Sequence, residues 1–150
     1  MKFGLAFSVL AVLLTGQFVH AHSGATGIVL ERMQLMKSVG SAMKSVGGMV
    51  SGKQEYNAEI VMAAANEIAG HGANIEGLFP DTKESRENKV SEAAPAIWEK
   101  QKEFLEEAAK MIKAAEKLAA ESGDKTTTTE AFKELGGTCK SCHESFRIKK

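Results

Sequence analysis

The sequence has few of the residues that favour sheets and tight turns. Aromatic residues make up 6% of the 150 positions, and only two prolines are present. No segment alternates apolar and polar residues for long enough to indicate a strand. The formal net charge is zero, which gives no support to a nucleic-acid partner. A chain of this length predicts one domain with a single hydrophobic core.

The first residues have the features of an export signal. Lys2 precedes an apolar run at residues 5–14, and the small residues Val19 and Ala21 suit a signal peptidase. We therefore predict a signal peptide over residues 1–21 and a mature protein of residues 22–150 in the periplasm. No later apolar segment approaches the ~18 residues of a membrane helix, so no membrane span is expected in the mature chain.

Apolar residues at helical spacing predict four helices in the mature chain. The first covers residues 26–50, and the second begins after Asn57, an N-cap candidate, and ends before Pro80. The third covers residues 95–121, and the fourth runs from there towards the end of the chain. This pattern predicts an all-α fold, an antiparallel four-helix bundle.

Several details of these helices follow from the same pattern. A capping box of Thr127 and Glu130 is expected to begin the last helix. The polar stretch 81–91 is expected to be an unpatterned surface connection. The predicted inner face of the second helix consists of Ile60, Val61, Ala64 and Ile68. The predicted apolar line of the third helix consists of Trp98, Leu105, Ile112 and Ala119.

The only two cysteines stand close together near the end of the chain. Cys139 and Cys142 are followed directly by His143, in the C-x-x-C-H order used to attach a c-type haem. Cysteines three residues apart project from neighbouring positions of one helical face, so their thiols can bond to the two vinyl groups of one porphyrin. The next residue can offer an imidazole nitrogen to the iron. The motif therefore predicts one covalent haem c.

Three other uses of the cysteine pair were weighed. A zinc site lacks a convincing fourth ligand, since the other histidines of the mature chain are His22 and His71. A thioredoxin-like redox pair needs a strand before its helix. A disulfide closing so small a loop would constrain the unfolded chain little. Export also favours haem, because covalent attachment of c-type haem takes place outside the cytoplasm.

The place of the motif shows where a second iron ligand would come from. Few residues follow His143, so a distal ligand must lie upstream, and the first helix contains four methionines, Met33, Met36, Met43 and Met49. Four segments together resemble the cytochrome c' family, the class II c-type cytochromes. They are ERMQLMKSVG at 31–40, GLFPD at 77–81, PAIWEKQKEF at 95–104 and GGTCKSCHESFRIK at 136–149.

The resemblance implies a role for several residues. Cys139 and Cys142 would form the thioether bonds, and His143 would be the proximal iron ligand. Arg32 matches an arginine near a haem propionate, and Met36 matches the position facing the distal side of the iron. Without the resemblance, Arg32 would be an ordinary solvated charge and Met36 a core methionine.

The resemblance bears on one further residue near the motif, and two other residues have no expected contact with the haem. Arg147 matches a basic residue near the proximal histidine. His71 and Trp98 are expected to be structural.

Two functions are compatible with this site. With Met36 bound to the iron, the protein would be a low-spin electron carrier that serves a redox partner protein. With Met36 unbound, it would be a five-coordinate, high-spin protein that binds a small gas such as nitric oxide or carbon monoxide. The small or polar residues Lys37, Gly40 and Ser41 near Met36 would leave room for the gas. No enzyme is expected, because the first helix offers no general acid or base there.

Two expectations concern partners. Relatives usually form dimers through their first two helices, which implies a homodimer that could share Val39, Val46 and Ile60. A basic cluster near the motif could steer an acidic redox partner, and it consists of Lys140, Arg147, Lys149 and Lys150.

Overall fold

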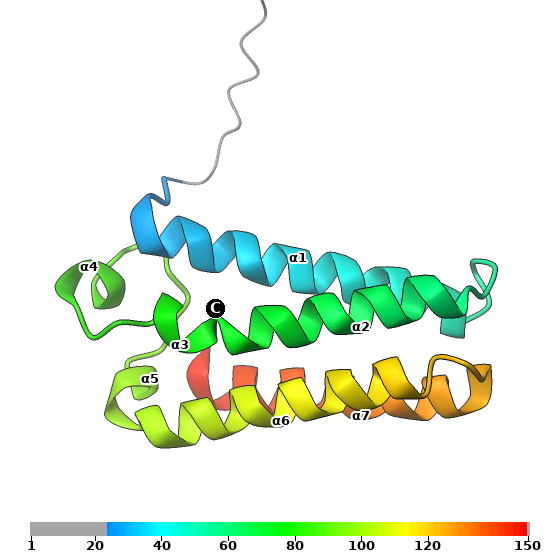
Figure 1. Cartoon of the computed structure of the whole chain (residues 1–150). Helices are drawn as coiled ribbons and strands as arrows, with labels where there is room; N and C mark the ends of the chain where they lie inside the picture. The colour runs from blue at the N-terminus through cyan, green and yellow to red at the C-terminus, as the bar shows by residue number, and fades with distance from the viewer. Residues whose placement is uncertain (1–23, 150) are drawn as a thin grey trace, which may run out of the picture.

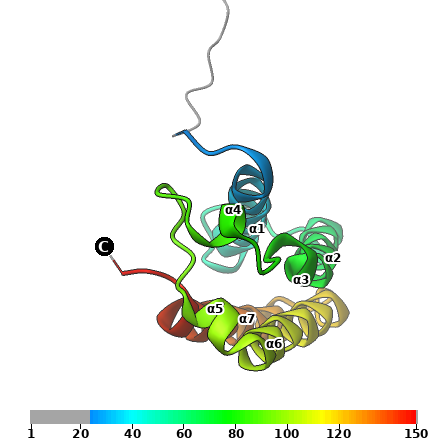
Figure 2. The same ribbon diagram turned by 90° about the vertical axis from the view of Figure 1, so that its left-hand side faces the viewer.

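Four long helices form a bundle in residues 24–149, the part of the chain that the structure, a computed structural model, describes (Figure 1). They are α1 (Gly27–Val50), α2 (Ala58–Ala73), α6 (Gln101–Ala120) and α7 (Lys125–Phe146). Three short helices are α3 (Ile75–Leu78), α4 (Lys83–Arg86) and α5 (Ala96–Glu99). The long helices alternate in direction and occupy the four corners of the bundle in the end view (Figure 2). The predicted all-α bundle is confirmed.

The predicted signal peptide at residues 1–21 lies outside the described residues. Within residues 24–149, no helix has the length and apolar character needed to cross a membrane.

Helix α1 begins and ends close to where the sequence predicts. It is followed by Ser51 and by Gly52, whose φ of 77° suits glycine and turns the chain back towards α2. Val39 and Val46 are 7% and 0% exposed and belong to the chain's own core. The expectation that a partner chain would share these two valines is therefore wrong, since their side chains are already enclosed.

Helix α2 has the predicted cap. The Asn57 side chain accepts a hydrogen bond from the backbone N–H of Ile60 at 3.0 Å. Ile60 itself is 46% exposed, so its predicted place on the inner face is wrong. The buried line of the helix runs through Val61, Ala65 and Ile68, and Ile60 lies just outside it.

The predicted third helix is divided in two. Lys100, with φ −129° and ψ 45°, leaves the helical conformation and separates α5 from α6. The fully buried line consists of Ile97, Phe104, Met111 and Leu118. It lies one residue before the predicted line, whose members are half-buried.

Helix α7 begins earlier than predicted. Its N-cap is Asp124, whose carboxylate accepts hydrogen bonds from the backbone N–H groups of Thr126 and Thr127 at 2.9 and 3.0 Å. The prediction of Thr127 as N-cap is therefore wrong. A carboxylate is a good cap and also interacts favourably with the positive end of the helix dipole, which explains why the helix starts at the acid.

The connection between α3 and α6 folds over one end of the bundle (Figure 2). It is not merely a surface link, because Ser85 in α4 is fully buried. Its later part pairs with the C-terminal segment, where the N–H of Ala94 donates to the carbonyl of Phe146 at 3.0 Å and the N–H of Ile148 donates to the carbonyl of Glu92 at 2.8 Å. The end of α7 is thereby tied to this connection.

Candidate haem site

Both cysteines lie on the core-facing line of α7. Along that line Leu135 is 0% and Phe146 is 6% exposed, whereas Cys139 and Cys142 between them are only half-buried. Both thiols are free. The line is therefore partly accessible at the two cysteines and closed at Leu135 and Phe146, an arrangement that suits a group bonded to both thiols.

The surroundings of the thiols do not suit redox or zinc chemistry. Burial raises the pKa of Cys139, and burial together with the charge of Glu107 raises the pKa of Cys142 to about 11. A reactive redox cysteine needs a lowered pKa, so a thioredoxin-like pair is not supported. Within residues 24–149, no group of three or more His, Cys, Asp or Glu side chains is placed to hold a metal ion. The zinc alternative therefore gains no support either.

His143 stands in the last turn of α7 and is exposed. Partial desolvation, and then the charge of Arg147, lower the pKa of its imidazole. A lowered pKa favours the neutral ring, which is the form that donates a nitrogen lone pair to a metal.

Arg32 is the most buried charged residue near the site. Its side chain is 5% exposed, and burial lowers the pKa of its guanidinium. Its Nη2 donates to the carbonyl oxygen and to Oγ of Ser85 at 2.9 and 3.1 Å. Its Nε and Nη1 are buried without a hydrogen-bond partner. The expectation of an ordinary solvated charge is therefore wrong, and two donors stand ready for an anion.

Aromatic rings continue from Arg32 to the end of α7. The Arg32 guanidinium carbon lies 4.6 Å from the centre of the Phe79 ring. Edge-to-face contacts then join Phe79 to Phe104 and Phe104 to Phe146, with ring centres 4.9 and 5.3 Å apart. Trp98 donates its indole N–H to the carbonyls of residues 79 and 80, both at 3.1 Å. These rings form a rigid wall at this end of the bundle.

The register of α1 against α7 follows from one close approach. A Cβ atom added to Gly47 would lie 3.3 Å from the Phe132 ring, so the two helices meet at this level. Met36 precedes Gly47 by eleven residues, and His143 follows Phe132 by eleven residues. Eleven residues are three helical turns, about 16 Å, in each helix. Because α1 and α7 are antiparallel, Met36 and His143 lie at about the same level along the bundle.

Met36 also lies on the appropriate side of α1. Eleven residues complete three helical turns almost without rotation, so Met36 is on the same line as Gly47, the line that faces α7. Its side chain is half-buried against the core. Met33, by contrast, is 39% exposed and points away from the core.

The basic cluster predicted near the motif is largely paired. The Arg147 Nε donates to Glu92 Oε2 at 2.7 Å, and its Nη2 pairs with the same oxygen. Lys140 lies 3.8 Å from Glu144. Lys150 is outside the described residues. The charge available to steer an acidic partner is therefore smaller than the sequence indicates.

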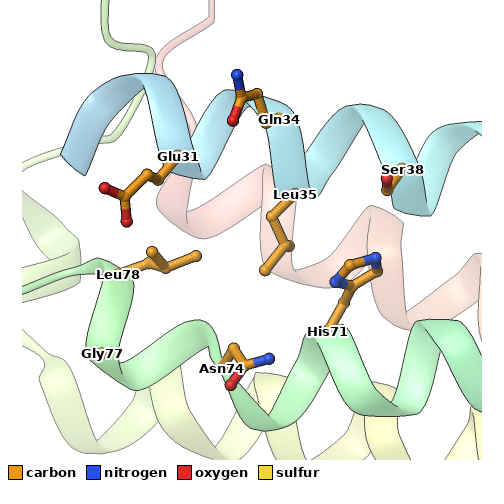
Figure 3. A pocket seen from close by; sticks show the side chains of 8 residues that line it. All are labelled: Glu31, Gln34, Leu35, Ser38, His71, Asn74, Gly77 and Leu78. Atoms are coloured by element: carbon orange, nitrogen blue, oxygen red, sulfur yellow. The ribbon is translucent and has the colours of Figure 1, made fainter. Parts of the chain in front are cut away.

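An open groove of about 500 Å³ lies elsewhere, between α1 and the α2–α3 segment (Figure 3). His71 lines it together with Glu31, Gln34 and Asn74, and its ring lies 3.4 Å from Glu67. None of the cysteine-motif residues lines this groove. It is therefore separate from the candidate haem site.

Sequence reasoning missed two residues beside the site. Ser85 is buried and binds Arg32, although the sequence around it is polar and without pattern. Glu107 on α6 pairs with Lys110 at 2.6 Å, and Lys110 and then Ser141 lower the pKa of its carboxyl. No local signal marks Ser85, whose partner lies in another helix. Glu107 has only its i, i+3 spacing to Lys110 as a local signal, because its contact with Ser141 depends on how α6 packs on α7.

The residues present fit a covalent haem. Two half-buried cysteines with free thiols and a histidine stand in the order that haem c requires, and Arg32 offers two unpartnered buried nitrogens to a carboxylate. The bundle and this site together define a c-type haem protein of the helical-bundle class.

Comparison with known proteins agrees with this class. The family model described as cytochrome C' matches residues 27–147. Cytochrome c-556 of Agrobacterium tumefaciens strain II Chrys is 36% identical over 125 residues, covering 83% of this chain and 99% of that protein. Cytochrome c-554 of Cereibacter sphaeroides is 36% identical over 120 residues, covering 79% of this chain and 78% of that protein. The structure of cytochrome c' from Rhodopseudomonas palustris superposes with a TM-score of 0.77 at 28% identity, covering 84% of this chain and 99% of that one.

The chain belongs to the cytochrome c' family. The resemblance stated from the sequence is thereby confirmed. Members of this family are non-enzymatic proteins that bind c-type haem, which also agrees with the expectation that the chain is not an enzyme.

Proposed function

We propose that the chain is a periplasmic electron-transfer protein with one haem c. Cys139 and Cys142 hold the haem through thioether bonds, His143 is the proximal iron ligand, and Met36 is the distal one. The observation that carries the proposal is the register of the bundle, since Met36 and His143 lie at one level on facing lines of α1 and α7.

The surrounding residues suit this role. When bound, the haem supplies an iron that cycles between the ferric and ferrous states. A histidine and a methionine as axial ligands keep the coordination shell nearly unchanged between these states, and methionine raises the reduction potential. The lowered pKa of His143 keeps its nitrogen free to donate at neutral pH. Arg32 offers its unpartnered donors to a haem carboxylate.

One observation favours the second candidate, a five-coordinate protein that binds nitric oxide or carbon monoxide. Gly40 lies one turn after Met36, and a Cβ atom added to Gly40 would meet nothing within 4 Å. This open space beside the distal position leaves room for a diatomic gas.

Absorption spectra of the ferric and ferrous protein, recorded with and without carbon monoxide, separate the two functions. We expect low-spin spectra and no carbon monoxide binding, because Met36 occupies the sixth position. Met36→Leu removes the sulfur donor at nearly constant volume and is expected to give a high-spin protein that binds carbon monoxide.

Met43→Leu is the matched control. Met43 is another half-buried methionine on the same line of α1, one heptad further on, where its level no longer matches that of His143. Its replacement is expected to leave the spectra unchanged. A wild-type protein that is high-spin and binds carbon monoxide would show instead that Met36 is not a ligand, and would favour the gas binder.

We further propose that the functional unit is a homodimer formed through α1 and α2 and that it exchanges electrons with a redox partner protein. Large apolar side chains are exposed on these two helices, namely Met33, Ile60 and Met62. Met33 lies near the start of α1, whereas Ile60 and Met62 lie near the start of the antiparallel α2, so they are separate candidate contacts with another chain.

A further inference from the structure

The Arg32 guanidinium is held from one side only. Its Nη2 has two acceptors, the carbonyl oxygen and Oγ of Ser85, at 2.9 and 3.1 Å. Its Nε and Nη1 are buried and have no hydrogen-bond partner. Arg32 and Ser85 are 53 residues apart in the chain, so this contact exists only because α4 folds back over the start of α1.

The surroundings of the guanidinium leave its charge uncompensated. The Phe79 and Trp98 rings lie 4.6 and 6.0 Å from its central carbon. Within residues 24–149 its only polar partners are the two Ser85 oxygens, and no carboxylate pairs with it. A buried guanidinium needs an anionic partner, and the unpartnered N–H groups of Nε and Nη1 can each donate a single charge-assisted hydrogen bond to a carboxylate oxygen.

Helix α4 keeps Ser85 in its place. The Ser85 backbone N–H donates to Thr82 Oγ1 at 3.3 Å, and this bond caps the short helix. Arg86 in the same turn pairs with Asp81 at 2.6 Å and lies over the Trp98 ring at 5.5 Å. The position of the Ser85 oxygens is therefore set by several contacts that do not involve Arg32.

We propose that Ser85 is a positioning residue for the haem. By fixing Nη2 with two acceptors, it sets the orientation of the guanidinium, so that the unpartnered Nε and Nη1 are left to donate to a haem carboxylate and the positive charge stays beside the haem. The inference rests on the proposed function, because it needs an attached haem. A fixed positive charge near the haem disfavours the ferric form, so α4 tunes the reduction potential through Ser85 and Arg32.

The test is a double-mutant cycle on the purified holoprotein, with the midpoint reduction potential as the readout. Arg32→Gln removes the charge and is expected to lower the potential. Ser85→Ala removes the hydroxyl acceptor and is expected to lower it by less, because the guanidinium is then held only by the backbone carbonyl. In the Arg32→Gln background, Ser85→Ala is expected to have no further effect, since it acts through Arg32.

Two further variants complete the design. Ser91→Ala changes another half-buried serine of the same connection, one that accepts a hydrogen bond from the Ala93 N–H, and is expected to leave the potential unchanged. Thr82→Val removes the cap of α4 at an exposed position, where folding is not at risk, and is expected to lower the potential in the same direction as Ser85→Ala.

Three results would overturn the proposal. Ser85→Ala could lower the melting temperature and leave the potential unchanged, which is what a purely structural serine would do. It could lower the potential equally in both backgrounds, which would show that it acts independently of Arg32. Arg32→Gln could leave the potential unchanged, so that Arg32 would not face the haem. Failure of the proposed function looks different, because the spectrum of the wild-type protein would then be high-spin and responsive to carbon monoxide, or would show no covalent haem, before any change at Arg32 or Ser85.

Discussion

At the residue scale, Tyr56 joins the two loops at the end of the bundle opposite Arg32. Its hydroxyl donates to the carbonyl of Ser122 at 2.7 Å and lies 2.7 Å from Thr128 Oγ1. Thr128 is fully buried and also donates to the carbonyl of Glu121 at 2.7 Å. The loop before α2 is thereby fastened to the loop between α6 and α7 by a connected set of hydrogen bonds.

Tyr56→Phe removes the hydroxyl and keeps the ring. We expect the free energy of unfolding to fall by about 1–2 kcal/mol, because the Ser122 carbonyl and the Thr128 hydroxyl lose a partner in a poorly hydrated place. Urea denaturation measures the change. Ser51→Ala, which removes an exposed hydroxyl bonded to the Gly48 carbonyl at 3.2 Å, is the control and should alter stability by less than about 0.5 kcal/mol. Equal losses in both variants would contradict this account of Tyr56.

Residues of the candidate site differ in how far the sequence predicts them. The spacing of Cys139, Cys142 and His143 is by itself typical of haem attachment, so this motif can be recognised in the sequence without knowledge of the fold. Arg32 could be assigned only from the family resemblance, since a helix charge is ordinarily solvated. Ser85 could not be predicted at all, because its importance depends on a contact with a residue in another helix, across a connection without any pattern.

At the element scale, α2 and α6 approach each other closely at Gly72. A Cβ atom added there would lie 2.6 Å from Ile112 Cγ1 and 3.1 Å from the terminal methyl of Met111. Glycine is unfavourable inside a helix, yet α2 continues through Gly70 and Gly72 to Ala73. Gly72 therefore serves packing, because only a residue without a side chain fits against α6.

Gly72→Ala tests this close approach. Overpacking is expected to lower the free energy of unfolding by about 1–3 kcal/mol, since Ile112 and Met111 must move. Gly70→Ala is the matched control two residues away, where an added Cβ atom meets nothing within 4 Å. It should raise stability by up to about 1 kcal/mol through helix propensity alone. Thermal or urea unfolding of the two variants gives the comparison, and a stabilised Gly72→Ala protein would disprove the packing argument.

The ends of the helices show which local signals are reliable. The sequence predicts Asn57 as the N-cap of α2, and its side chain does cap the helix. No other capping residue stands directly before it. The sequence also predicts Thr127 as the N-cap of α7, but Asp124 caps this helix instead, because its carboxylate accepts hydrogen bonds from two backbone N–H groups. No glycine or proline marks the break at Lys100 in the sequence, so the division into α5 and α6 could not be predicted.

At the scale of the whole molecule, the topology brings the two candidate iron ligands together. Four alternating helices place α7 antiparallel to α1, and the contact between Gly47 and Phe132 sets their register. Heptad spacing in the sequence predicts the bundle, but it does not fix how far one helix is shifted along another. That shift depends on the loops and on side-chain packing, so the common level of Met36 and His143 becomes visible only in the fold.

The exposed large apolar side chains are unequally distributed over the described part of the molecule, and their distribution bears on how two chains could assemble. The large apolar side chains exposed in residues 24–149 are Met33, Ile60, Met62 and Ile148. The first three belong to α1 and α2, the helices through which we propose dimerisation. Val39 and Val46 are buried in the monomer, so we expect outward-facing residues such as Ile60 to contribute to the proposed interface.

Ile60→Glu tests the dimer. Ile60 is 46% exposed, so the fold should tolerate a carboxylate, but burying that charge between two chains should raise the dimer dissociation constant by about tenfold or more. Sedimentation analysis over a range of concentrations measures it. Ile148→Glu is the matched control, the same change at a side chain that is 45% exposed in the C-terminal segment. Because both variants add one negative charge, a rise in dissociation constant confined to Ile60→Glu places the interface on α2, whereas equal behaviour would mean that α2 does not form it.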